Sequence, residues 1–175
     1  MKQIEKIIKS HPCITEIMNN LDKYFIICLY GGRDSGKSYL MAQIIVMLCC
    51  LYKVKMAVFR AENKQLDDSI KDKIVDVIKE WGLDIYCYSK LKKNRSIIVN
   101  NKITITIGGH TSVIRFDAVE NNPEKLRGGF DEYDYMVFEE WSQFSGRVME
   151  IALPTIERAR SGMPHILGKI GRAHV

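Results

Sequence analysis

The chain has 175 residues, and 26 Lys and Arg against 21 Asp and Glu give it a net charge of +5. A hydrophobic fraction of 46% with a charged fraction of 27% predicts one folded domain and excludes wholesale disorder. No apolar stretch reaches the ~18 residues that span a bilayer. The five cysteines form no C-x-x-C pair, which indicates buried thiols in a reducing compartment. The small basic excess fits an anionic partner such as a nucleotide or a nucleic acid.

The first half of the chain alternates predicted helices with predicted strands. An uninterrupted apolar run at residues 24–30 is typical of a strand buried on both faces. Residues 37–51 are apolar almost all round, which predicts a buried helix. This order predicts a parallel sheet with right-handed crossovers. The expected elements are a helical segment within 2–22, a strand at 24–30, a helix at 37–51, a strand at 55–59 and a helix at 65–81 that ends at Gly82.

The second half of the chain begins with a different pattern. Apolar and polar residues alternate in three short segments joined by Asn100-Asn101 and Gly108-Gly109, which predicts antiparallel hairpins that extend the sheet. A short, fully apolar strand and a final helix follow. The expected elements are strands at 96–99, 103–107, 113–116 and 135–138 and a helix at 147–158.

A phosphate-binding motif lies between the first strand and the next helix. Residues 31–38, Gly-Gly-Arg-Asp-Ser-Gly-Lys-Ser, match G-x-x-x-x-G-K-[ST]. The glycines let backbone N–H groups turn inward around a phosphate, and the helix N-terminus favours the anion. Lys37 has the reach for the β- and γ-phosphates, and the Ser38 hydroxyl is a ligand for Mg²⁺. We therefore expect ATP and Mg²⁺ as cofactors, bound by Gly31, Gly32, Arg33, Asp34, Ser35, Gly36, Lys37 and Ser38.

Two acidic residues, Glu139 and Glu140, follow the apolar strand at 135–138. Ligands of open parallel sheets bind at the carboxyl ends of the strands, so we expect these acids beside the phosphate-binding loop. Phosphoryl transfer needs carboxylates to hold Mg²⁺ and to activate water. We assign Glu139 to the Mg²⁺ site and Glu140 to activation of water. The alternative is that the two acids merely begin a helix, where negative charge is favourable.

The ordered set of motifs resembles the large terminase subunit of tailed phages, in the branch common in phages and prophages of Gram-positive bacteria. The resemblance covers roughly residues 24–160. The matching segments are the loop at 31–38, Val58-Phe59-Arg60, the helix at 66–83, Gly108-Gly109 with Ile114-Arg115-Phe116, residues 124–128 and Phe138-Glu139-Glu140-Trp141.

The resemblance implies a P-loop NTPase of the α/β class, with a mostly parallel central sheet flanked by helices and an antiparallel hairpin extension. It implies an ATP-hydrolysing motor that packages double-stranded DNA into a procapsid. It also implies a homo-oligomeric ring on the portal with a small terminase subunit, in the host cytoplasm. Arg33 matches a position that contacts the γ-phosphate in cis, and Arg127 a position that acts on a neighbouring subunit's ATP. Catalytic roles are therefore expected for Lys37, Arg33, Glu140 and Arg127.

We expect three parts in the chain: a helical segment at 1–22, the ATPase domain at 23–168 and a non-native tail at 169–175. The tail sequence is what a common sequencing adapter gives on translation, so we expect a shortened chain that lacks the family's nuclease domain, and no structural role from residue 168 onward. Two other functions stay open. One is a different DNA-associated P-loop ATPase, helicase-like or partitioning, and the other is a nucleotide-binding fragment without turnover.

Overall fold

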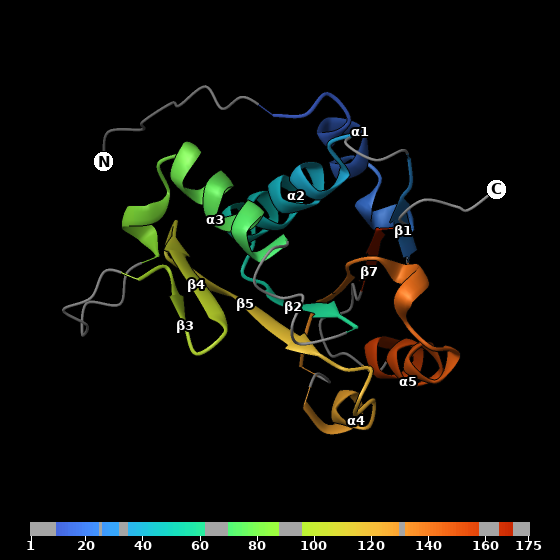
Figure 1. Cartoon of the computed structure of the whole chain (residues 1–175). Helices are drawn as coiled ribbons and strands as arrows, with labels where there is room; N and C mark the ends of the chain where they lie inside the picture. The colour runs from blue at the N-terminus through green and yellow to red at the C-terminus, as the bar shows by residue number, and fades with distance from the viewer. Residues whose placement is uncertain are drawn as a thin grey trace.

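A computed structural model describes residues 10–24, 26–31, 35–61, 70–87, 96–129, 132–157 and 165–169. Seven strands form one sheet in the order β1-β7-β6-β2-β5-β4-β3 (Figure 1). Neighbours from β1 to β5 are parallel, whereas the β3–β4 and β4–β5 pairs are antiparallel. The strands are β1 (Ile26–Leu29), β2 (Lys55–Arg60), β3 (Ile98–Val99), β4 (Lys102–Ile107), β5 (His110–Ala118), β6 (Tyr135–Phe138) and β7 (His165–Lys169).

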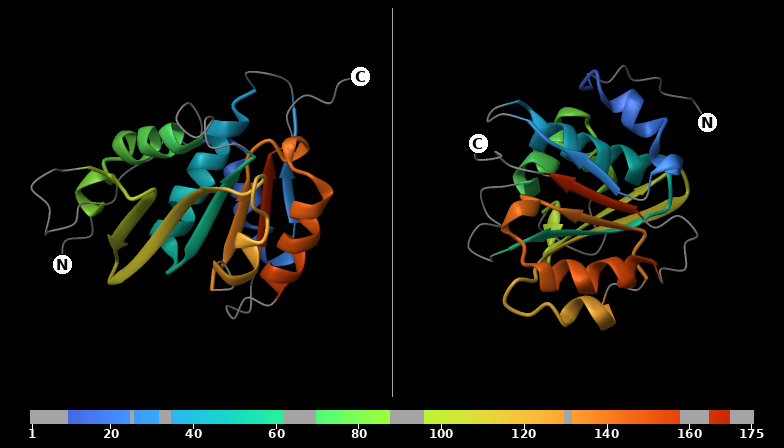
Figure 2. Two further views of the ribbon diagram at one scale, coloured as in Figure 1. Left: turned by 60° about the horizontal axis from the view of Figure 1, so that its bottom comes forward. Right: turned by 90° about the vertical axis from the view of Figure 1, so that its right-hand side faces the viewer.

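Helices cover both faces of this sheet, as the right-hand view of Figure 2 shows. One hydrophobic core joins α1, α2 and α3 to the sheet, and a second core joins α4 and α5 to its other face. Adjacent residues of β2 and β6 enter opposite cores, because successive side chains of a strand point to opposite faces. The helices are α1 (Ile14–Met18), α2 (Lys37–Leu51), α3 (Ile70–Glu80), α4 (Lys125–Gly129) and α5 (Gly146–Glu157), with 3₁₀ turns η1 (Leu21–Lys23), η3 (Asp84–Tyr86) and η4 (Trp141–Gln143).

The predicted α/β class and mostly parallel sheet are confirmed. Helix α2 has the predicted bounds and is buried on nearly every side. Helix α3 ends at Glu80, and the predicted stop residue Gly82 follows in the turn with a left-handed φ of 63°, which costs little without a Cβ. Both predicted hairpin turns are present, since Asn100 and Asn101 have positive φ, as do Gly108 and Gly109. Residues 1–9 and 65–69 of the predicted helical segments lie outside the described residues.

Strand β1 differs from its prediction. The apolar run predicts burial on both faces, but residues along β1 alternate between exposed and half-buried, and Ile26 is 41% exposed. The cause is its place in the sheet: β1 is the outermost strand, and β7 is its partner within the described part of the chain. The prediction of burial on both faces is therefore wrong for this strand.

Two further elements were not predicted from the residue pattern. Helix α4 is a single short turn, and β7 follows α5 in the chain. Gly168 and Lys169 belong to β7, with Lys169 opposite Leu29, so the expectation of no structural role is wrong for these two residues. Within the described ranges, no helix is both long enough and apolar enough to cross a membrane.

Candidate functional site

The phosphate-binding loop and the acidic pair lie at the same end of the sheet. Across the parallel strands, Cys28 of β1 is opposite Gly168 of β7, which in turn is opposite Phe138 of β6. The loop begins at Gly31, soon after this row of residues, and Glu139 follows it directly. One strand separates β1 from β6, so their backbones are about 10 Å apart at ~4.8 Å per spacing.

The loop leads directly into α2. Gly36 caps the helix with a φ of 76°, in the left-handed region that glycine adopts readily, and the Leu40 amide donates to its carbonyl at 2.8 Å. The Lys37 ammonium reaches back across the loop and donates to the Gly31 carbonyl at 2.8 Å and to the Ser35 hydroxyl at 3.0 Å. The ammonium therefore links Gly31 and Ser35, two described residues of the loop sequence.

Close packing explains the glycine at position 31. A Cβ added there would lie 3.1 Å from the Ser35 hydroxyl oxygen, which would have to shift slightly, and 3.8 Å from the Lys37 ammonium, an ordinary contact. Ser38 is half-buried in the first turn of α2. Gly32, Arg33 and Asp34 of the predicted site lie outside the described residues.

Neighbouring elements hold α2 in place by polar contacts that the sequence pattern does not reveal. The buried Gln43 side chain accepts a hydrogen bond of 2.8 Å from the His11 backbone amide ahead of α1. On the other side, the Tyr39 hydroxyl donates to the Glu80 carboxylate of α3, and this bond raises the pKa of Tyr39. The helix that carries Lys37 and Ser38 is thus fixed from two sides.

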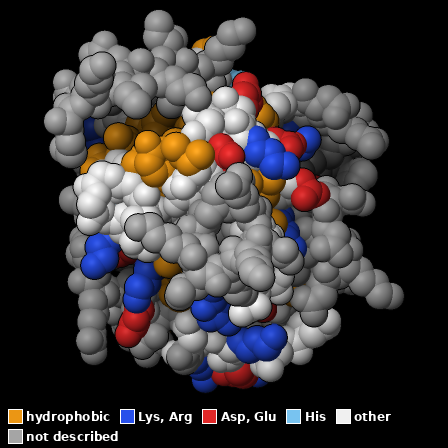
Figure 3. Space-filling view, turned by 90° about the vertical axis from the view of Figure 1, so that its left-hand side faces the viewer, with side chains coloured by type: hydrophobic (Ala, Val, Ile, Leu, Met, Phe, Trp, Pro, Cys, Tyr) orange, Lys and Arg blue, Asp and Glu red, His pale blue; other side chains and the backbone are white. Residues whose placement is uncertain are grey.

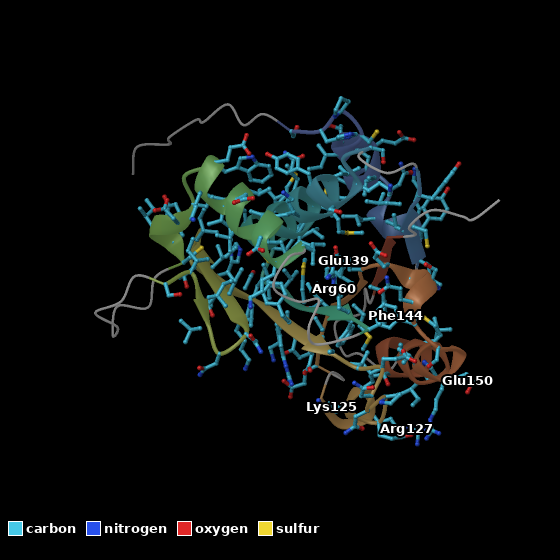
Figure 4. The ribbon with its side chains drawn as sticks, in the orientation of Figure 1. Arg60, Lys125, Arg127, Glu139, Phe144 and Glu150 are labelled. Carbon is cyan, nitrogen blue, oxygen red and sulfur yellow. The ribbon has the colours of Figure 1, made fainter. Side chains whose placement is uncertain are left out.

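Glu139 is buried against an arginine. Its side chain is 2% exposed, and one carboxylate oxygen lies 2.7 Å from the Nε of Arg60, which is 14% exposed at the end of β2. The same oxygen accepts a hydrogen bond of 3.3 Å from the backbone amide of Ile70, the first residue of α3. Figure 4 shows Glu139 and Arg60 side by side above the sheet. The predicted metal ligand is therefore also part of a buried ion pair, which the sequence analysis missed.

Glu140 occupies a bend directly after β6. Its φ of 56° and ψ of 61° are left-handed, an uncommon conformation for a residue with a side chain. Its carboxylate accepts a hydrogen bond of 2.9 Å from the Gln143 side chain. Phe138 anchors the bend, because Trp141 and Phe144 pack edge-on against its ring with centroid distances of 5.4 and 5.2 Å.

Arg127 lies apart from these groups. It is on α4, whose residue Leu126 packs into the core on the face opposite α2. Figure 4 shows Arg127 at the lower edge of the molecule, away from Glu139 and Arg60. Its side chain is 63% exposed and pairs with Glu124 at 3.1 Å, while Arg147 pairs with the same carboxylate at 3.0 Å. The structure does not bring Arg127 to its own chain's phosphate-binding loop.

Oxygen ligands for magnesium are available at the acidic end of the sheet. Mg²⁺ prefers a few carboxylate or hydroxyl oxygens together with substrate phosphates and water. The Ser38 hydroxyl and the Glu139 and Glu140 carboxylates have this chemistry. Among the described residues, no group of three or more His, Cys, Asp and Glu side chains is arranged to hold a metal ion by itself.

The opposite end of the sheet carries a different polar surface. A cavity of about 380 Å³ opens there, beside the starts of β2, β5 and β6. Both signs of charge line it, and the Lys55 ammonium pairs with Glu132 at 2.7 Å. The charges are also mixed on the face in Figure 3, where described basic and acidic side chains alternate without one large basic patch. The cavity is lined by Lys53, Val54, Lys55, Thr111, Val113, Glu132 and Asp134.

Solved structures share this fold. A large terminase from a thermophilic bacteriophage matches with a TM-score of 0.68 and 14% identity over 93% of this chain and 39% of its own. Its complex with ADP matches at 0.64, with 15% identity over 91% of this chain and 38% of that one. The Thermus phage P74-26 large terminase ATPase domain matches at 0.64, with 16% identity over 95% and 67% of the two chains. A chain of the bacteriophage phi29 viral genome packaging motor assembly matches at 0.62, with 13% identity over 95% and 48%.

The comparisons differ in how much they cover. The chain spans about two fifths of the large terminase from the thermophilic phage, at an identity that shows the fold alone. A search of curated protein sequences gives no significant match. The family model for the phage terminase large subunit, in contrast, matches residues 23–167. Because that model covers most of the chain, the chain belongs to the phage terminase large subunit family.

Proposed function

We propose that this chain is the ATPase part of a packaging motor, which hydrolyses ATP to drive double-stranded viral DNA into a procapsid. One observation carries the proposal: the register of the parallel strands brings the phosphate-binding loop and the acidic pair to one end of the sheet. Membership of the phage terminase large subunit family supports DNA packaging as the process that the ATPase drives. The structure of a related large terminase in complex with ADP supports a nucleotide as the ligand.

Each described residue of the loop has a role in this proposal. Backbone N–H groups at 31–38 bind the phosphates, and the Lys37 ammonium turns from its contacts with Gly31 and Ser35 to the β- and γ-phosphates. Ser38 and Glu139 hold Mg²⁺. An ion held there would supply positive charge beside the transferred phosphoryl group.

Glu140 is the proposed general base. It follows Glu139 directly, and its left-handed backbone directs the chain sharply away from the end of β6. A non-glycine residue held in this conformation costs on the order of 1 kcal/mol, and such strain gathers at functional sites. Its carboxylate would take a proton from the attacking water while Gln143 orients it through their hydrogen bond.

Two arginines complete the proposal. Arg33, within the loop sequence, would contact the γ-phosphate of its own subunit. Arg127 would act on a neighbouring subunit's ATP, since it is exposed on α4 on the far side of the sheet from α2. A ring of identical subunits on the portal, with a small terminase subunit and in the host cytoplasm, is the assembly in which such an arginine works. The similarity to a chain of a packaging motor assembly supports this arrangement.

Steady-state ATP hydrolysis by the purified chain, with and without double-stranded DNA, tests the function. We expect Mg²⁺-dependent turnover that falls by about 10²–10⁴-fold in Glu140→Gln, because the amide keeps the shape but cannot accept the proton. Nucleotide affinity should stay unchanged in this variant. Nucleotide binding without turnover in the wild type would instead favour the nucleotide-binding fragment. Turnover that depends on single-stranded DNA would favour a helicase-like ATPase.

A further inference from the structure

Arg60 and Glu139 reach the same face of the sheet from neighbouring strands. In β2, Met56 and Val58 enter the core under α2 and α3, and alternation places Arg60 on that face too. In β6, Tyr135 and Val137 enter the same core, so alternation carries Glu139 to it as well. This is the face on which α2 presents the phosphate-binding loop. The ion pair therefore lies between the sheet and the nucleotide site.

The geometry of this pair is specific. Arg60 donates from Nε at 2.7 Å, and the Ile70 amide donates to the same Glu139 oxygen at 3.3 Å. Both side chains are well removed from solvent, with exposed fractions of 14% and 2%. A buried charge pair is weak evidence of stabilisation by itself, because desolvation of the two charges offsets their attraction. Its position against a proposed metal ligand indicates a different use.

We propose that Arg60 is a positioning residue that holds the Glu139 carboxylate in place for the Mg²⁺–nucleotide complex. The proposal deepens the proposed function and rests on it. Two donors on one oxygen fix the plane of the carboxylate, and the donors come from the end of β2 and the start of α3. Arg60 itself does not touch the nucleotide. It affects nucleotide binding only by positioning Glu139. A change at Arg60 should therefore alter the nucleotide affinity in Mg²⁺ and not the affinity in EDTA.

The other strand arginine provides a matched control. Arg115 of β5 pairs with Asp117 at 3.0 Å, and their side chains are 32% and 18% exposed. Asp117 also lies 3.8 Å from Lys125 of α4, which places this pair on the face opposite α2. Arg115→Gln therefore removes one paired arginine from the same sheet without touching the proposed site.

The experiment measures the affinity for a fluorescent ATP analogue with Mg²⁺ and with EDTA, and takes the ratio of the two dissociation constants. We expect Arg60→Gln to reduce the strengthening by Mg²⁺ about tenfold, the effect of one hydrogen bond to a charged group. The affinity in EDTA should stay within about twofold. In Arg60→Lys, too, Mg²⁺ should strengthen nucleotide binding much less than in the wild type, because a flexible ammonium lacks the planar geometry of the guanidinium. Arg115→Gln should behave as wild type.

A double-mutant cycle with Glu139→Gln shows whether Arg60 acts through Glu139. If it does, Arg60→Gln has no further effect on the ratio once Glu139 is Gln. Should Arg60→Gln alone fail to fold, Arg60→Lys takes its place in the cycle. Additive losses would overturn the proposal, as would an equal loss of affinity in EDTA and in Mg²⁺. A wild type that binds nucleotide equally well with and without Mg²⁺ would also overturn it, whereas a wild type that binds none would overturn the proposed function.

Discussion

Two arginine–glutamate pairs in this molecule have similar chemistry and opposite surroundings. Arg60 and Glu139 are 2.7 Å apart and almost fully buried at the end of the parallel strands. Arg127 of α4 and Glu124, the residue before that helix, are 3.1 Å apart, with 63% and 46% of their side chains exposed. Water screens the second pair and cannot screen the first to the same degree. We therefore expect the buried pair to affect the stability of the protein more strongly than the exposed pair.

The pairs also differ in what brings them together. Glu124 and Arg127 are three residues apart and meet through one helical turn. Arg60 and Glu139 are 79 residues apart and meet because β2 and β6 are neighbours in the sheet. Breaking the buried pair thus disturbs the junction of β2, β6 and α3, whereas breaking the exposed pair changes surface contacts near α4 and α5.

The sharpest test of this contrast is the stability of matched alanine variants. Glu139→Ala removes the carboxylate that faces the buried Arg60 charge, and we expect a loss of about 3–5 kcal/mol in the free energy of unfolding. Glu124→Ala removes an exposed carboxylate and should cost at most about 1 kcal/mol. Chemical denaturation of both variants measures the difference. Equal losses in the free energy of unfolding would show that the buried pair contributes no more to stability than the exposed pair.

Glu140 directly follows Glu139 of the buried pair, and it allows stability and turnover to be tested separately at this end of the sheet. Glycine tolerates its left-handed backbone without a Cβ clash, so Glu140→Gly should raise the stability by about 1 kcal/mol. The same change should abolish ATP turnover. Thermal denaturation and a hydrolysis assay on one preparation measure both. A stability gain with full turnover would remove Glu140 from the proposed base role.

Arg127→Ala tests the exposed pair. We expect a change of no more than about 0.5 kcal/mol in stability, since Arg127 sits in a surface contact. Turnover in dilute, monomeric protein should stay at the wild-type rate, whereas turnover in assembled rings should fall. Hydrolysis measured across protein concentrations, with the oligomeric state followed by light scattering, separates the two cases. An equal loss in the monomer would contradict action in trans.

Another small effect, which depends on pH, is expected from the exposed pair Lys55 and Glu132. The hydrogen bond to Glu132 raises the pKa of Lys55 above its unfolded value of about 10.4. Its stabilisation is therefore fully present below that value and is lost as the pH rises through the folded pKa. With 49% of Lys55 exposed, we expect less than about 1 kcal/mol. The stability difference between wild type and Lys55→Gln should shrink above about pH 10.4, and a constant difference would contradict the assignment.

Local sequence patterns predicted the elements whose form depends on nearby residues. Helix α2 and strand β6 have the predicted bounds, because continuous apolar runs between glycines and polar residues leave few other conformations. The hairpin turns were predictable for the same reason, since Asn-Asn and Gly-Gly pairs accept positive φ at little cost.

Features set by remote parts of the chain could not be predicted in this way. β1 lies at the edge of the sheet because of where β7 inserts, and an apolar run contains no information on strand order. The partner of Glu139 was equally hidden, although an arginine at the end of a buried strand is itself a signal: such a charge needs a partner nearby. The sequence motif around Arg60 indicated the family but not the contact.

The central claim is that the nucleotide binds at the carboxyl ends of the strands, between the loop at 31–38 and Glu139. Its most direct test is the affinity for MgATP in two lysine variants at opposite ends of the sheet, Lys37→Ala at the loop and Lys53→Ala at the cavity. We predict a loss on the order of 10–100-fold for Lys37→Ala, as expected for removal of charged hydrogen bonds to phosphate, and a change within about twofold for Lys53→Ala. Unchanged affinity in Lys37→Ala together with a loss in Lys53→Ala would contradict the account.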